Sequence, residues 1–137
     1  MRQPVMLLAI STLGACVSPL PPVDNKQAWV DLYTITPGKT LMAERLDGKR
    51  LTDGRFFQVT PGAHELVVRF DYEIYSGGFS TDPTERTCYL TIKFAHFKAG
   101  QRYRLEARAP AMRPSAYLYD AQRKMVAEES NDAFCTP

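Results

Sequence analysis

The segment ELVVRFDYEIY, residues 65–75, alternates apolar and polar side chains with a period of two residues. One face is apolar and consists of Leu66, Val68, Phe70 and Tyr72. The other face is charged and carries Glu65, Arg69 and Asp71. This alternation is typical of a strand in an antiparallel sheet that has one face in the core and one in solvent. The segment therefore predicts a half-buried β-strand.

The same period continues on both sides of this segment. Further strands are predicted over residues 29–35, 40–46, 56–59, 87–97, 102–108, 115–120 and 124–128. The pairs Pro37-Gly38, Asp47-Gly48 and Pro61-Gly62 favour tight turns, and residues 121–123 would close a final hairpin. Residues 41–46 also have helical propensity. About seven or eight short strands predict an all-β domain, a single antiparallel β-sandwich or barrel, of which we favour the sandwich.

The N-terminus has the composition of an export signal. Arg2 precedes the apolar run of residues 5–13, and Leu13-Gly14-Ala15-Cys16 follows. The run is too short for a transmembrane helix, which needs roughly 20 residues, and Leu13 is unsuited to an ordinary secretory cleavage after Ala15. Leu-Gly-Ala-Cys resembles the lipobox of bacterial lipoproteins, in which the cysteine is acylated and becomes the new N-terminus.

The lipobox resemblance implies a location. Residues 1–15 would be a signal peptide, and Cys16 would carry the acyl chains, palmitate among them, that bind the membrane. In that family, a residue such as Val17 after the cysteine permits transfer to the outer membrane. Residues 16–27 contain three prolines and predict an extended tether, so that residues 28–137 would form the domain at the periplasmic face.

Composition limits the classes of function. The 137-residue chain has enough length after signal removal for one domain with a core but not for two. Its formal net charge of +2 gives no electrostatic footprint for nucleic acid. Cys88 and Cys135 remain as an even pair in an oxidising compartment and predict a disulfide that pins the C-terminus, with two free thiols as the alternative.

A second resemblance concerns residues 46–120. Asp47-Gly48, the run Val59-Thr60-Pro61-Gly62-Ala63-His64 and the alternating strand after it are similar to the PEGA-type modules of small envelope lipoproteins. Residues 98–105, KAGQRYRL, are similar to another strand of those proteins. The resemblance implies an immunoglobulin-like or PEGA-like sandwich, and it implies no activity, since function cannot be inherited from a fold.

The chain lacks the motifs of common catalytic or metal sites. His64 and His96 are its two histidines, and neither belongs to a ligand cluster. We expect His64 to bond a carbonyl of the Pro-Gly turn. We therefore expect no catalytic residue, no metal and no cofactor, and predict that the protein is not an enzyme.

Two surfaces are candidates for binding. Arg102, Arg104 and Arg108 form an outward row that suits an anionic partner such as peptidoglycan carboxylates or lipid phosphates. The alternative is a solvated face neutralised by Glu106 and by acids such as Glu65 or Asp71. The second candidate is the long loop of residues 75–86, with Tyr75 and Phe79 as apolar contacts; its alternative is a mobile hairpin tip.

These features favour a non-enzymatic module that binds or scaffolds another envelope protein or the cell wall. A second hypothesis is an inhibitor or immunity-like lipoprotein that blocks an envelope enzyme through residues 75–86. A third is a hydrolase with an unrecognised site, which would need a titratable cluster in a cleft.

Overall fold

The computed structural model describes residues 14, 16–35, 39–75, 77, 78, 82–130 and 132–136. Within these residues the chain forms β1 (Ala28–Thr34), β2 (Thr40–Leu46), β3 (Lys49–Arg50), β4 (Phe56–Val59), β5 (Gly62–Ile74), β6 (Thr84–Phe97), β7 (Arg102–Arg108), the 3₁₀ turn η1 (Pro110–Met112), β8 (Ser115–Tyr119), β9 (Met125–Glu128) and β10 (Phe134–Thr136). No helix in this part of the chain has the length and hydropathy needed to cross a membrane.

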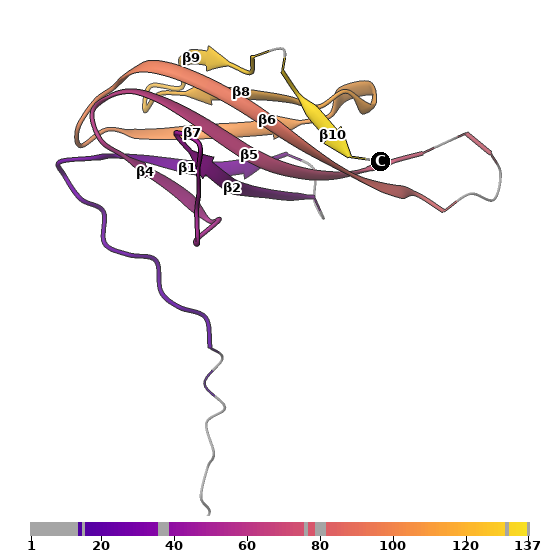
Figure 1. Ribbon diagram of the computed structural model, residues 1–137, viewed down its shortest axis with the longest axis horizontal. Coiled ribbons are helices and arrows are strands. Elements are labelled where there is room, and N and C mark those ends of the chain that lie inside the picture. The colour runs from indigo at the N-terminus through magenta and orange to yellow at the C-terminus, as the bar shows by residue number, and fades with distance from the viewer. Residues whose placement is uncertain are drawn as a thin grey trace, which may run out of the picture.

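The strands form two five-stranded sheets packed face to face, with the order β4-β1-β7-β8-β9 in sheet A and β10-β6-β5-β2-β3 in sheet B (Figure 1). The predicted β-sandwich is confirmed. The described residues contain ten strands because β3 and β10, of two and three residues, add to the eight predicted segments. Among the described pairings, β1 with β7 is parallel, from Trp29 beside Arg102 to Thr34 beside Ala107.

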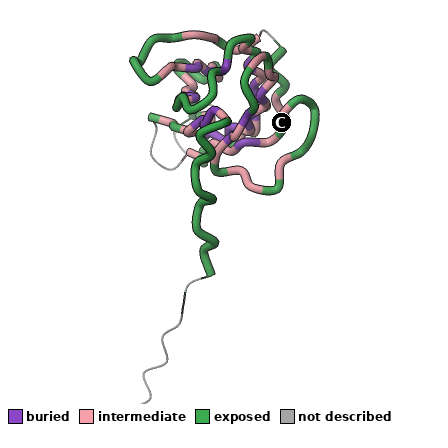
Figure 2. The backbone as a smooth tube through the Cα atoms, turned by 90° about the vertical axis from the view of Figure 1, so that its left-hand side faces the viewer, coloured by how far each residue is buried: buried purple, intermediate pink, exposed green. Residues whose placement is uncertain are grey.

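Alternation along the strands places the core between the two sheets. The largest fully buried side chains come from both sheets: Phe57, Leu105 and Leu118 from sheet A, and Leu66, Phe70, Leu90 and Ile92 from sheet B. Each contributes about 1.5–3 kcal/mol by leaving water. Figure 2 shows this buried backbone inside an exposed shell. The predicted inward faces of residues 65–75 and 102–108 are confirmed.

The Asp47-Gly48 turn has the predicted hairpin geometry. Asp47 and Gly48 have φ angles of 50° and 80°, and two successive positive φ angles define the type I′ turn that suits the twist of a hairpin. Residues 41–46 form strand β2, paired with β5 and interrupted by a bulge between Ala43 and Arg45, so their helical propensity is overridden by sheet pairing. The predicted Pro37-Gly38 turn lies outside the described residues.

The two ends of the chain are held differently. Cys88 and Cys135 are disulfide-bonded, with Cα atoms 4.0 Å apart on paired strands β6 and β10, as predicted. Residues 16–26 are exposed and leave the domain as an extended segment (Figures 1 and 2). Arg55 Nη1 donates a hydrogen bond to the Ser18 carbonyl oxygen at 2.8 Å, which links this segment to the loop before β4. The proposed signal residues 1–13 and 15 lie outside the described part of the chain.

Candidate binding face on sheet A

The outer face of sheet A brings the predicted arginine row next to aromatic side chains. Because the interior side chains of β7 are Tyr103, Leu105 and Ala107, the arginines at positions 102, 104 and 108 point outward. The Cζ atoms of these arginines lie over three rings: Arg102 is 5.9 Å from the Trp29 centroid, Arg104 is 3.8 Å from that of Tyr33, and Arg108 is 4.7 Å from that of Tyr117. We call this set the arginine–aromatic face.

Arg102 forms a bidentate ion pair with Asp31. Its Nε and Nη2 donate to Asp31 Oδ2 and Oδ1 at 2.6 and 2.9 Å. Asp31 also accepts a hydrogen bond from the Trp29 indole at 2.9 Å. The hydrogen bond from Arg102 lowers the pKa of Asp31, and burial opposes this effect. The same contact raises the pKa of Arg102. These two hydrogen bonds connect the start of β7 to the neighbouring strand β1.

Arg104 and Arg108 each contact one polar side chain. Arg104 Nε lies 3.0 Å from Glu106 Oε1, and Arg108 Nη2 donates to Tyr119 Oη at 3.1 Å. The face is thus neutralised mainly by Asp31 and Glu106.

The expectation that Glu65 or Asp71 neutralises the row is wrong, because both residues belong to β5 in the opposite sheet. Glu65 Oε2 lies 3.7 Å from Lys93 Nζ. Asp71 accepts hydrogen bonds from Arg69 and Thr87 at 3.1 and 2.6 Å.

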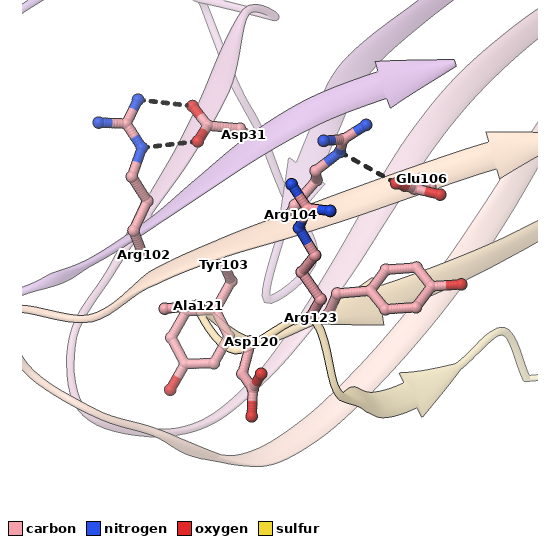
Figure 3. Close-up of a pocket in the computed structure, with 9 residues that line it drawn as sticks. Asp31, Arg102, Tyr103, Arg104, Glu106, Asp120, Ala121 and Arg123 are labelled. Carbon is pink, nitrogen blue, oxygen red and sulfur yellow. Dashed lines mark hydrogen bonds and ion pairs between the residues drawn. The ribbon is translucent and has the colours of Figure 1, made fainter. Parts of the chain in front are cut away.

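A cavity of about 540 Å³ opens beside Arg102 and Arg104. Its lining comprises Asp31, Arg102, Tyr103, Arg104, Glu106, Tyr119, Asp120, Ala121 and Arg123 (Figure 3). This volume lies in the range of small-ligand sites. Arg123 comes from the turn between β8 and β9, and Figure 3 shows its side chain running from that turn toward Arg104. The sequence placed residues 121–123 in a turn but gave Arg123 no role.

The second predicted surface is smaller than expected. Thr84, Glu85 and Arg86 belong to β6 and pair with β5, so the connection spans residues 75–83 rather than 75–86. Tyr75 is 62% exposed, and its hydroxyl donates to Glu73 Oε2 at 3.1 Å. Lys39 Nζ lies 3.2 Å from the same oxygen and lowers the pKa of Glu73. Phe79 lies outside the described residues.

His64 links two turns. As predicted, its ring contacts a turn carbonyl, with Nε2 2.7 Å from Thr60 O, while Nδ1 lies 2.6 Å from Asp47 Oδ2. The Thr60 hydroxyl lies 3.0 Å from Nε2, an order of groups that resembles a catalytic triad. However, Nε2 lies closer to the Thr60 carbonyl oxygen than to the hydroxyl, and a carbonyl oxygen only accepts hydrogen bonds, so the ring is not arranged as a base toward the hydroxyl. The backbone N–H of Glu65 is the main cause of a lowered Asp47 pKa.

His96 is exposed at the end of β6, with its ring 6.2 Å from that of Phe94. Within the described ranges, no three residues of the types His, Cys, Asp and Glu lie close enough together to hold a metal ion. Comparison with known proteins gave no match to a family model, a curated protein sequence or a solved structure.

Proposed function

We propose that this protein is a lipid-anchored binding module of the outer membrane. It faces the periplasm, has no catalytic activity of its own, and recognises an envelope partner through the arginine–aromatic face. The observation that carries the proposal is the row of Arg102, Arg104 and Arg108 over aromatic rings on one exposed sheet face. Trp, Tyr and Arg dominate the energetics of protein binding surfaces.

The anchor is supported by the N-terminal sequence and the segment that follows it. The resemblance of residues 13–16 to a lipobox makes Cys16 the acylated residue, and Cys16 is exposed with a free thiol. An extended segment of ten residues reaches roughly 30 Å. This length lets the domain clear the lipid headgroups, so that the arginine–aromatic face is open to other envelope components.

A second candidate function is that of an inhibitor that blocks an envelope enzyme. It is favoured by the β5–β6 hairpin, which projects beyond the neighbouring strands (Figure 1). Exposed Tyr75 at the end of β5 would be its apolar contact.

Site-specific crosslinking in living cells separates the two candidates. A photoreactive amino acid replaces Tyr33 on the arginine–aromatic face, Tyr75 on the hairpin, or Tyr89 on the outer face of sheet B as the matched control. We expect a crosslinked partner from position 33 and none from position 89. Crosslinks from position 75 alone would favour the inhibitor, and none from either position 33 or position 75 would refute the binding module.

The anchor is tested by fractionation. We expect Cys16→Ser to move the protein from the membrane fraction to the soluble periplasmic fraction, because the thioether to lipid is lost. A Ser18→Ala variant is the control, because only the backbone carbonyl of Ser18 is used in the contact with Arg55. Normal membrane recovery of the Cys16→Ser protein would refute lipid anchoring.

A further inference from the structure

We propose that Arg123 and Arg104 form a clamp for a carboxylate of the cell wall, carried by a peptidoglycan fragment that enters the 540 Å³ cavity. This inference rests on the proposed function and names the ligand of the same face. It is carried by three observations: an unusual backbone position, an unpaired guanidinium and the polar lining of the cavity.

Arg123 occupies a backbone conformation that favours glycine. The turn closes with Asp120 N–H donating to Lys124 O at 2.9 Å and Arg123 N–H donating to Asp120 O at 3.0 Å. Arg123 has a φ angle of 63°, which is the left-handed position of a three-residue hairpin loop. A side chain there costs stability relative to glycine. Non-glycine residues in this left-handed conformation are concentrated at functional sites.

The guanidinium of Arg123 lacks an acidic partner among the described residues, whereas the cavity's three carboxylates are engaged elsewhere. Asp31 binds Arg102, and Glu106 lies against Arg104. Asp120 Oδ1 accepts the backbone N–H groups of Gln122 and Lys124, each at 2.9 Å. In Figure 3 the Asp120 carboxylate points away from the Arg123 guanidinium.

Arg104 and Arg123 line the same cavity, and an anion bound between two guanidinium groups offsets their repulsion. Arg123 is the one cation of this lining without a carboxylate partner in the described structure. A guanidinium without a carboxylate partner can bind a carboxylate ligand through two parallel hydrogen bonds.

The rest of the lining favours a fragment that also carries hydrogen-bond donors. Asp31, Glu106, Asp120 and Tyr119 are among the residues that line the cavity. Hydroxyl and amide groups of a sugar–peptide would donate to the three carboxylates, and the Tyr119 ring would cover an apolar face of the ligand. A lipid phosphodiester carries the same single negative charge as a carboxylate, so binding to phospholipid vesicles is measured beside binding to muropeptides to distinguish the two sources.

The test uses the full mature protein, extracted from membranes in a non-ionic detergent and titrated with muropeptides by calorimetry. Muropeptides are disaccharide–peptides released from peptidoglycan by a muramidase. Arg123→Gly removes the charge and relieves the backbone. Lys124→Gly removes the same charge one residue further along and does not alter the cavity lining.

We expect Arg123→Gly to weaken muropeptide binding at least about 10-fold, since a charge-assisted hydrogen-bond pair is lost, and to keep or raise the melting temperature. Lys124→Gly should change affinity less than about 2-fold. Converting the muropeptide carboxylates to amides should reproduce the loss seen with Arg123→Gly.

Three results would overturn the clamp. The first is an unchanged muropeptide affinity in Arg123→Gly, and the second is an equal loss of affinity in Lys124→Gly. The third is that the wild-type protein does not bind muropeptides. Binding to phosphatidylglycerol vesicles that disappears in Arg123→Gly would likewise replace the cell-wall ligand with a lipid. Crosslinking at position 33 and the fractionation of Cys16→Ser do not depend on Arg123, so they report separately on the binding module.

Discussion

Removing the Cys88–Cys135 disulfide should cost this domain a large share of its stability. The bond closes a chain segment with a sequence separation of 47 residues. In the chain-entropy model such a loop lowers the entropy of the unfolded state by about 14 cal/mol/K, which corresponds to about 4 kcal/mol at 25 °C. A domain of this size has a total stability of about 5–15 kcal/mol. The double variant Cys88→Ala/Cys135→Ala should therefore have a melting temperature lower by roughly 15 °C.

Few noncovalent contacts would hold β10 in place once the disulfide is removed. Strand β10 has three residues, and its exposed Phe134 buries little apolar surface. Without the covalent link we expect β10 to detach from β6 and the unfolded chain to expand, which raises the slope of a urea titration.

Trp29 is the single tryptophan, is 3% exposed and stacks on Phe56 at 4.3 Å, so its fluorescence reports unfolding. The control is Thr136→Ala, which removes only one side-chain hydrogen bond of β10 and should cost less than about 1 kcal/mol. A loss below about 1 kcal/mol in the double variant would refute the reasoning.

Three further changes test individual contacts. Arg123→Gly should stabilise the fold by about 1 kcal/mol in urea titrations, since glycine relieves the left-handed residue; a loss of stability would contradict this assignment. His64→Ala should cost about 1–2 kcal/mol because it breaks the links to Asp47 and Thr60, whereas exposed His96→Ala should stay within about 0.5 kcal/mol. Burial raises the pKa of Glu129, with a smaller contribution from Glu128, so folding favours its protonated form and stability falls as pH rises above the unfolded pKa. Glu129→Gln should therefore add about 1 kcal/mol at pH 7, where the charged group has one buried oxygen without a partner. That gain should vanish below about pH 4, where the wild-type group is protonated, and a gain independent of pH would exclude ionisation as the cause.

Local patterns were sufficient to predict most strands. The period of two along residues 65–75 and 102–108 identified their buried faces, and Asp47-Gly48 identified its turn, because these signals act within a few residues. Strands β3 and β10 were missed because two or three residues are too few to show a period. Thr84, Glu85 and Arg86 are all polar or charged, so they show no apolar alternation and were assigned to a loop. They form a strand in the structure because this part of β6 pairs with β5.

The sequence by itself determined an all-β chain, the outward direction of Arg102, Arg104 and Arg108, and the partnership of Cys88 with Cys135, since each depends on local alternation or on counting. Only the tertiary structure decided which acids neutralise the arginines and which rings lie beneath them. Asp31 and Tyr33 lie about 70 residues before their arginine partners and reach them through the parallel pairing of β1 with β7. The cavity beside Arg123 also depends on tertiary structure, because its lining combines Asp31 of β1 with residues of β7 and of the turn after β8. Sheet membership depends on how distant strands share one core, and no short stretch of sequence carries that information.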